Sequence, residues 1–308
     1  MNSRLSVREW GRRAVLRRLA VLERELKRLQ RRPDADSIHD TRVAGRRLRA
    51  SLRHLEGEFH AGQAQRLRNE VAQVARLLGE IRDLDILVEN LAPEARRAAS
   101  PFQTLLTSHA RRRARLLATV APAARALSER LEWWSVRWSA TIRAGEGSPI
   151  VENFPKTYPP LIERYFRRGR KLVRRKAGPE ELHRFRIRTK RIRYITEIYE
   201  ELAPRTLRAA LREFRMIQGI LGDMQDQSMV IAYFERRLMD VRTPRRQTEY
   251  MRVLHRARVR QAFFRESFFR RWTRLEAGRA EKRWLAGIKA PSSAPSSRGA
   301  ARTGRASA

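Results

Sequence analysis

The chain has 308 residues and a formal net charge of +36, yet 42% of its residues are hydrophobic. This hydrophobic content predicts a folded protein rather than a basic tail, and the absence of cysteine excludes disulfides, thiolate metal sites and a cysteine nucleophile. Of the 69 basic residues, 62 are arginine, so we expect a polyanionic partner: nucleic acid, an anionic membrane surface, an acidic protein or a chain of phosphates. No apolar run approaches the ~18 residues of a membrane span, and the N-terminus lacks a signal-peptide pattern, so we expect a cytoplasmic protein without membrane contact.

Apolar residues recur at helical spacing along almost the whole chain, from "LAVLERELKRL" through "VAQVARLLGEIRDLDILVENL" to "LREFRMIQGILGDMQDQSMVIAYF". With strand-like alternation essentially missing, this pattern predicts an all-α protein of long antiparallel helices. Breaks between helices are expected near Gly57–Gly62 and at several prolines, namely Pro33, Pro93, Pro101, Pro122, Pro179, Pro204 and Pro244. The Gly/Pro-rich stretch around residues 144–156 suggests a boundary. We predict a first helical half over residues 1–145, a second over 146–285, and a disordered basic tail over 286–308.

Two motifs occur twice. "IHDTRVAGRRLR" returns as "LHRFRIRTKRIR" at an offset of 144 residues, and "LLGEIRDLD" returns as "ILGDMQDQS" at an offset of 143. Two separated motifs with nearly the same offset predict a duplicated helical unit, each copy burying its own core. We interpret Gly79 and Gly222, which match each other in the second motif, as points of close helix approach rather than phosphate loops.

The first motif predicts a cationic stripe on a helix. At ~100° per residue, positions 0, 3, 7 and 10 from the histidine share one face. One stripe contains His39, Arg42, Arg46 and Arg49, with Arg53 one turn later, and the other contains His183, Arg186, Lys190 and Arg193. Neighbouring like charges repel, so the stripes require either acidic partners, such as Glu80, Asp83 and Asp85, or an external anion. Because basic residues outnumber acidic ones by 69 to 33, many arginines must remain available to an anion.

The two histidines have two open interpretations. Each could be a packed, hydrogen-bonded residue, or each could donate a ring N–H to a phosphate. In the second case binding would strengthen as the pH falls from about 8 to 6.

Paired H-x-x-R-x-x-x-[RK]-[RK]-x-R helices, each followed about forty residues later by L-G-x-x-x-D, resemble the CHAD family, the conserved histidine α-helical domain, from about residue 5 to 277. The resemblance implies two helical bundles related by an internal pseudo-repeat, with a basic surface that binds inorganic polyphosphate and targets the protein to polyphosphate granules. One departure is that Arg82-Asp83 becomes Gln225-Asp226 in the second copy. The predicted polyphosphate-binding residues are His39, Arg42, Arg46, Arg47, Arg49, Arg53, His183, Arg186, Lys190, Arg191 and Arg193.

Other functions are less well supported by the sequence. Nucleic-acid binding would use the same electrostatics, but the stripes lack the aromatic residues on which single-stranded bases stack, and no helix-turn-helix pattern is present. A phosphatase or a polyphosphate kinase phosphorylated on His39 would need an activating group that the sequence does not offer. Glu23, Glu25 and Lys27 match the E-x-E-x-K signature of triphosphate-tunnel domains, but in an amphipathic helix rather than a strand. We therefore expect a binding protein that is not an enzyme and has no cofactor or metal.

Overall fold

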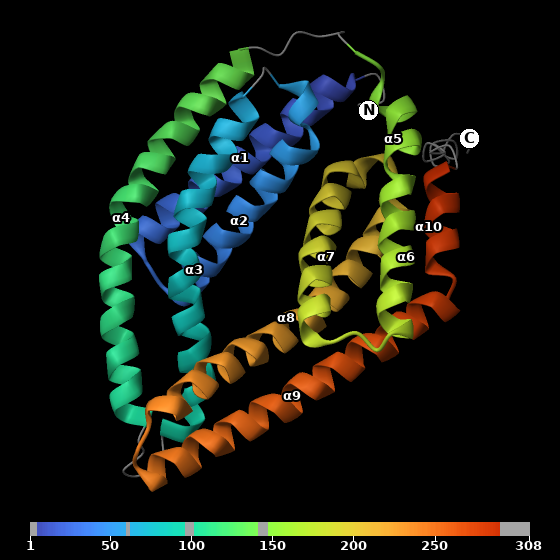
Figure 1. Ribbon diagram of the computed structural model, residues 1–308. Helices are drawn as coiled ribbons and strands as arrows, with labels where there is room; N and C mark the ends of the chain where they lie inside the picture. The colour runs from blue at the N-terminus through green and yellow to red at the C-terminus, as the bar shows by residue number, and fades with distance from the viewer. Residues whose placement is uncertain (1–4, 60–61, 96–101, 141–146, 290–308) are drawn as a thin grey trace, which may run out of the picture.

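The computed structural model describes residues 5–59, 62–95, 102–140 and 147–289 (Figure 1). In these ranges every regular element is a helix, and the only strand-like feature is an isolated bridge between Ser6 and Pro149. The predicted all-α fold of long helices is therefore confirmed. The α-helices are α1 (Val7–Arg31), α2 (Ala35–His54), α3 (Gln63–Ala95), α4 (Phe102–Ala140), α5 (Ile150–Thr157), α6 (Pro159–Arg174), α7 (Pro179–Tyr199), α8 (Pro204–Asp240), α9 (Pro244–Ala277) and α10 (Ala280–Lys289).

Several helices begin where the sequence carries a start signal. The Asp34 carboxylate accepts a hydrogen bond from the backbone N–H of Ser37 at 2.8 Å, which caps α2 directly after Pro33. Pro179, Pro204 and Pro244 each occupy the first turn of a helix, where the missing N–H costs nothing. The breaks predicted at these four prolines are confirmed.

The breaks predicted at Pro93 and Pro122 are wrong. Helix α3 continues past Pro93 to Ala95, and α4 runs through Pro122 near its middle. A proline inside a helix removes one hydrogen bond and crowds the preceding turn. At Pro122 the apolar side chains on either side, Val120 and Ala124, are buried in the core, and this packing outweighs the local penalty.

Three sequence predictions fall partly or wholly outside the described residues: the break at Pro101, the boundary at residue 145, and most of the tail. Helix α10 extends to Lys289, inside the range 286–308 that the sequence analysis assigns to the tail.

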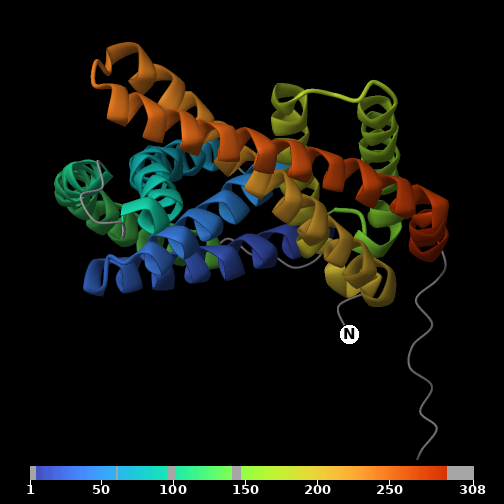
Figure 2. The same ribbon diagram turned by 90° about the horizontal axis from the view of Figure 1, so that it is seen from below.

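The chain forms two groups of helices joined by two long ones. In Figure 1, α1–α4 lie together on the left, and α5, α6, α7 and α10 lie on the right. Helices α8 and α9 pack along each other and reach from the right-hand group to the ends of α3 and α4, a course also visible from below in Figure 2. At that end Leu91, Phe102, Phe234 and Tyr250 form a small separate core.

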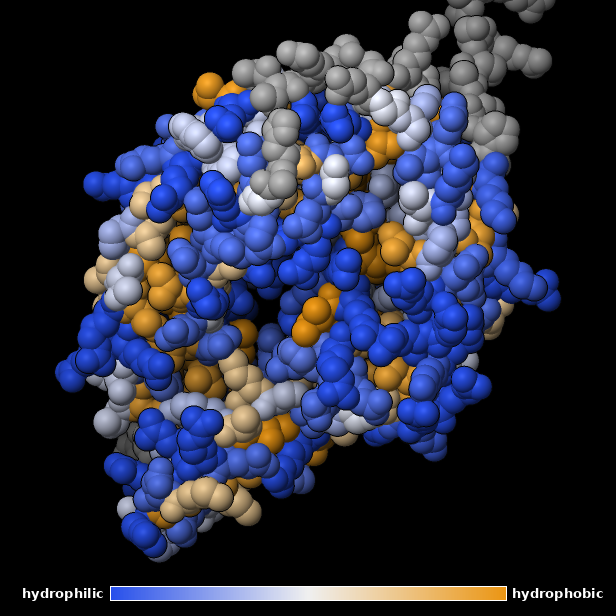
Figure 3. All heavy atoms as spheres, turned by 45° about the horizontal axis from the view of Figure 1, so that its top comes forward, coloured by the Kyte–Doolittle hydropathy of each residue, from blue (hydrophilic) through white to orange (hydrophobic). Residues whose placement is uncertain are grey.

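The two groups also meet through α2 and α7 and through the start of α1. The indole N–H of Trp10 donates to the carbonyl oxygen of Ile198 at 3.2 Å, and His54 Nε2 is hydrogen-bonded to the Tyr199 hydroxyl at 2.8 Å. The space-filling view shows a hollow near the centre of the molecule, bordered mostly by hydrophilic residues (Figure 3). The repeated motifs lie on the helices that contact one another between the two groups.

Candidate anion-binding site

The two copies of the histidine motif lie on α2 and α7, and each motif helix is held by an apolar face. On α2 the side chains of Ile38, Leu48 and Leu52 are fully buried, and on α7 those of Leu182 and Phe185 are buried. Each motif helix packs against the helix that carries the second motif, α2 against α3 and α7 against α8. The basic residues are thereby left on faces other than the packed ones, as the helical spacing predicts.

A glycine of the second motif makes room for an arginine of the first motif in both copies. A Cβ atom added at Gly79 would come within 2.9 Å of Arg42 Nη1, and one at Gly222 within 3.7 Å of Arg186 Nη2. Arg42 Nη1 also donates to the carbonyl oxygen of Ala75 on α3 at 3.4 Å. The group that approaches each glycine closely is thus the guanidinium of an arginine on the neighbouring helix.

Four basic side chains from the two halves form a central cationic cluster: Arg42, Arg46, Arg186 and Lys190. Burial lowers the pKa of Lys190 to about 6, and repulsion by the three arginines acts in the same direction. Burial also lowers the pKa of Arg42 to about 10, helped by Arg46. The sequence predicted two stripes, and the structure brings their central residues close to one another across the contact between α2 and α7.

The central cationic cluster has no direct counterion in the described part of the chain. None of its four members forms an ion pair there, and the Nε atoms of Arg46 and Arg186 are buried without a hydrogen-bond acceptor. Unpaired buried donors destabilise a fold, so an acceptor supplied from outside would relieve this cost. The arrangement suits an anion with several oxygen atoms.

The acidic residues that could have neutralised the stripes do so incompletely. Asp83 attracts Arg42 and Asp226 attracts Arg186, but burial raises the pKa of both carboxyl groups. Asp85 does not face the stripe, because it accepts a hydrogen bond from Arg113 Nε at 2.8 Å. Asp85 therefore does not neutralise the stripe. Asp83 attracts Arg42 without forming a direct ion pair with it.

The two motif histidines differ in their surroundings. His39 is exposed, although partial desolvation lowers its pKa, and Arg46 and Arg82 act in the same direction. His183 Nδ1 donates to the amide oxygen of Gln225 on α8. Gln225 occupies the position of Arg82 in the first copy. His183 therefore has a hydrogen-bond acceptor where His39 has a repelling cation. His183 is thus tied to the fold, whereas His39 borders the central cationic cluster.

Two of the predicted binding residues, Arg47 and Arg193, form ion pairs with one carboxylate at the contact between the halves. Glu197 on α7 pairs with Arg47 on α2 at 2.9 Å and with Arg193 on its own helix at 3.7 Å. Arg18 of α1 lies near the same carboxylate, and its pKa is lowered to about 10, chiefly because the side chain is partly withdrawn from solvent. Sequence reasoning missed Arg18, although its position between the buried Val15 and Leu22 on one helix face was a usable signal.

The remaining predicted residues lie away from the central cationic cluster. Arg49 lies among other cations. Burial lowers its pKa most, and repulsion by Arg53 and then Arg46 lowers it further. Arg191 is exposed and lines a groove between α6 and α7. The structure thus gathers four of the predicted residues, places His39 at their edge, and distributes the others over neighbouring surfaces.

The model of the CHAD domain family matches residues 13–235, more than two thirds of the chain. The chain belongs to the CHAD family. A crystal structure of the CHAD domain from the plant Ricinus communis superposes with a TM-score of 0.69 at 18% sequence identity, covering 89% of this chain and 93% of that one. No protein of curated function matches the chain.

Two further site types, a metal centre and a membrane span, are absent from the described ranges of the CHAD chain. No three histidine, cysteine or acidic side chains there lie close enough together to hold a metal ion. Each helix in those ranges is too short or too polar to span a bilayer.

Proposed function

We propose that this CHAD protein binds inorganic polyphosphate through the central cationic cluster, and that it acts as a binding protein rather than an enzyme. The observation that supports the proposal best is the meeting of Arg42 and Arg46 with Arg186 and Lys190, from two motif helices, without a direct counterion in the described residues. The family resemblance supplies the ligand class. Association with polyphosphate granules in the cytoplasm would follow from binding of the polymer.

The physical basis of binding is charge-assisted hydrogen bonding. A guanidinium presents a planar fork of N–H donors that matches two phosphate oxygens, so successive phosphates can be held by successive arginines. Binding also releases the counterions condensed on the polymer, so the affinity should fall steeply with salt. The bound anion also offsets the mutual repulsion of the three arginines and favours the charged form of Lys190.

The test compares the wild type with two variants that each lose three positive charges. The central variant carries Arg42→Gln, Arg46→Gln and Arg186→Gln. The surface control carries Arg66→Gln, Arg112→Gln and Arg125→Gln, at three exposed arginines of the first half that form no ion pair with any described residue. Binding of polyphosphate is measured at several salt concentrations, with single- and double-stranded DNA as competitors at equal phosphate concentration.

We expect the central variant to lose roughly a hundredfold or more in affinity, because hydrogen bonds to charged groups contribute about 1.5–3 kcal/mol each. The surface control should lose little beyond the effect of net charge. Equal losses in both variants, or equally effective competition by DNA, would show a general polyanion binder and would contradict the proposal.

A further inference from the structure

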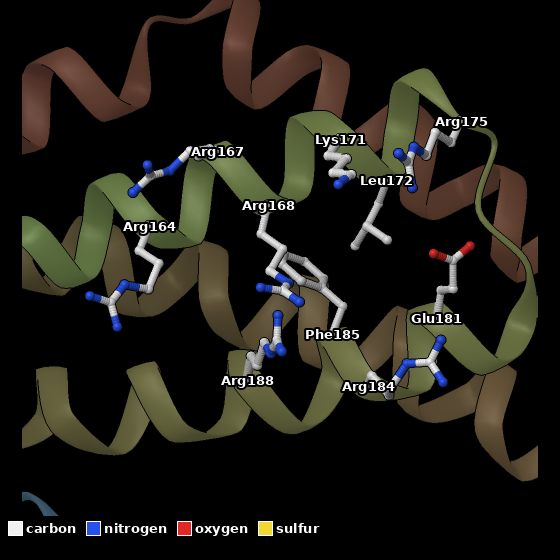
Figure 4. A pocket seen from close by; sticks show the side chains of 10 residues that line it. All are labelled: Arg164, Arg167, Arg168, Lys171, Leu172, Arg175, Glu181, Arg184, Phe185 and Arg188. Atoms are coloured by element: carbon white, nitrogen blue, oxygen red, sulfur yellow. The ribbon is translucent and has the colours of Figure 1, made fainter.

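A second group of cations lines a groove on the outer side of the second half, between α6 and α7 (Figure 4). We call it the outer groove. Its walls are hollowed to about 450 Å³ at one end and about 310 Å³ at the other, and the two hollows share Arg164, Arg168, Phe185 and Arg188. Its basic residues are Arg164, Arg167, Arg168, Lys171 and Arg175 from α6, and Arg184, Arg188 and Arg191 from α7.

Helix periodicity places these cations side by side. Each basic residue of α6 has another three or four positions away, so the five lie within one broad face, and Arg184 and Arg188 are four apart on α7. The close-up shows the Arg168 and Arg188 guanidinium groups pointing toward each other across the groove (Figure 4). The outer groove is therefore lined from both walls.

Helix α6 is held firmly by its other face. Ile162 and Phe166 are fully buried, and Gly169 lies so close to Trp272 of α9 that an added Cβ would stand 2.0 Å from the indole ring. This close contact fixes the position of α6 over the core. The outer groove is therefore a preformed feature, which lowers the ordering cost of binding.

The outer groove has almost no internal charge compensation. All eight cations are exposed, and in the described part of the chain only Arg184 forms an ion pair, with Glu180 at 2.6 Å. Glu181 is the single acidic residue among the lining side chains. Like charges three and four apart repel, and an anion in the groove would remove that repulsion.

The lining also indicates what kind of anion fits. Phe185 and Tyr165 form part of the floor, but they are 1% and 5% exposed, so neither offers a face on which a nucleic-acid base could stack. A phosphate chain needs no such face. Its repeated oxygens match a row of guanidinium groups.

We propose that the outer groove is a second binding site for phosphate chains, separate from the central cationic cluster. The choice of phosphate chains as the ligand rests on the proposed function. The location of the site is supported independently, by the shape of the groove and its excess of cations. Helix α7 carries both surfaces: Arg186 and Lys190 belong to the central cluster, and Arg184, Arg188 and Arg191 belong to the outer groove. A polymer long enough to pass around α7 could occupy both, which would raise its affinity over that of short chains.

The first experiment counts sites with tripolyphosphate, a probe too short to bridge the two surfaces. Calorimetric titration is performed on the wild type, the central variant, the surface control and a groove variant with Arg167→Gln, Lys171→Gln and Arg175→Gln. Glutamine keeps good helix propensity at these exposed positions, and all three variants lose the same charge. We expect two equivalents bound by the wild type and the surface control, and one by the central and groove variants.

The outcomes separate the two proposals. One equivalent in both the wild type and the groove variant would overturn the outer groove and leave the proposed function intact. If the central variant still bound as many equivalents of tripolyphosphate as the wild type, and the groove variant bound fewer, the outer groove would be supported. The central cluster would then be contradicted as a polyphosphate site.

The second experiment needs no substitution. Lys171 is the only lysine of the outer groove, so amine acetylation followed by mass spectrometry reports directly on it, with the exposed Lys282 of α10 as the internal control. We expect tripolyphosphate to slow acetylation of Lys171 several-fold and to leave Lys282 unchanged. Equal protection of both lysines, or equal protection of Lys171 by short single-stranded DNA, would overturn the proposal.

Discussion

Arg42 lies across the backbone of α3 at Gly79, where a Cβ atom would stand only 2.9 Å from its Nη1 atom. The equivalent pair in the second copy, Arg186 and Gly222, is looser, with 3.7 Å between the corresponding atoms. The two repeated motifs are therefore connected physically as well as by their spacing, because the glycine of one determines where the arginine of the other can lie. The difference between 2.9 and 3.7 Å allows a matched experiment.

Gly79→Ala should weaken polyphosphate binding without destabilising the fold. The added methyl group forces the flexible end of Arg42 to move away from α3, which misplaces one donor of the central cationic cluster. Alanine is favoured over glycine inside a helix by about 0.5–1 kcal/mol, so the free energy of unfolding should stay constant or rise. Denaturant unfolding and polyphosphate titration measure the two effects separately.

Gly222→Ala is the control for this prediction. Its Cβ would make an ordinary van der Waals contact with Arg186, so the variant should gain the same helix stabilisation and keep its affinity. If both alanine variants bound like the wild type, the position of Arg42 on Gly79 would not matter for binding.

Lys190 should make the stability of the free protein depend on pH. Its pKa is about 6 in the folded chain and near the ordinary 10.5 once unfolded, because burial and the neighbouring arginines disfavour its charge. Between these pH values the unfolded chain binds more protons than the folded chain, so the free energy of unfolding should rise with pH. Lys190→Met should flatten this rise in denaturant unfolding between pH 6.5 and about 9, whereas Lys282→Met, at an exposed site, should retain it.

Binding of polyphosphate should reverse the electrostatic situation at Lys190 and take up a proton. Arg42, Arg46, Arg186 and Asp226 act on this amine in the free protein, and an anion held by the arginines would favour its charged form. At pH 7.5 the amine is mostly neutral before binding, so the affinity should fall as the pH rises. Titration calorimetry in buffers of different ionisation enthalpy measures the uptake. An uptake that persists undiminished in Lys190→Met would assign it to another group, with His39 the next candidate.

Helix class and motif faces were predictable from the sequence because both depend on local periodicity. The spacing of His39, Arg42 and Arg46 fixes a common face whatever the tertiary structure, and Asp34 and Pro179 mark helix starts by their own chemistry. The continuation of α4 through Pro122 was not predictable, because packing of distant residues overrides the local penalty.

The parts of the site that the sequence could not predict depend on contacts between the halves. No local pattern shows that Glu197 pairs with Arg47, 150 residues away in the chain. The lowered pKa of Lys190 likewise depends on tertiary structure, first through burial of the amine and then through the arginines of both copies. The outer groove could not be predicted from the repeated motif, because the α6 wall carries no copy of that motif.

Glu197 should be a major source of stability at the contact between the halves. Its carboxylate is 12% exposed, as the partner of Arg193, which is 10% exposed, and of Arg47, which is 36% exposed. Glu197→Gln would leave Arg193 and the partly buried Arg18 without their nearby negative charge. Breaking a buried pair costs about 3–5 kcal/mol, and the partial exposure of Arg47 favours a value near 3 kcal/mol in denaturant unfolding. Glu201→Gln removes an exposed pair with Arg17, at 3.7 Å, and should cost less than about 1 kcal/mol. Similar losses in the two variants would mean that the Glu197 cluster is effectively solvated and contributes little to holding the halves together.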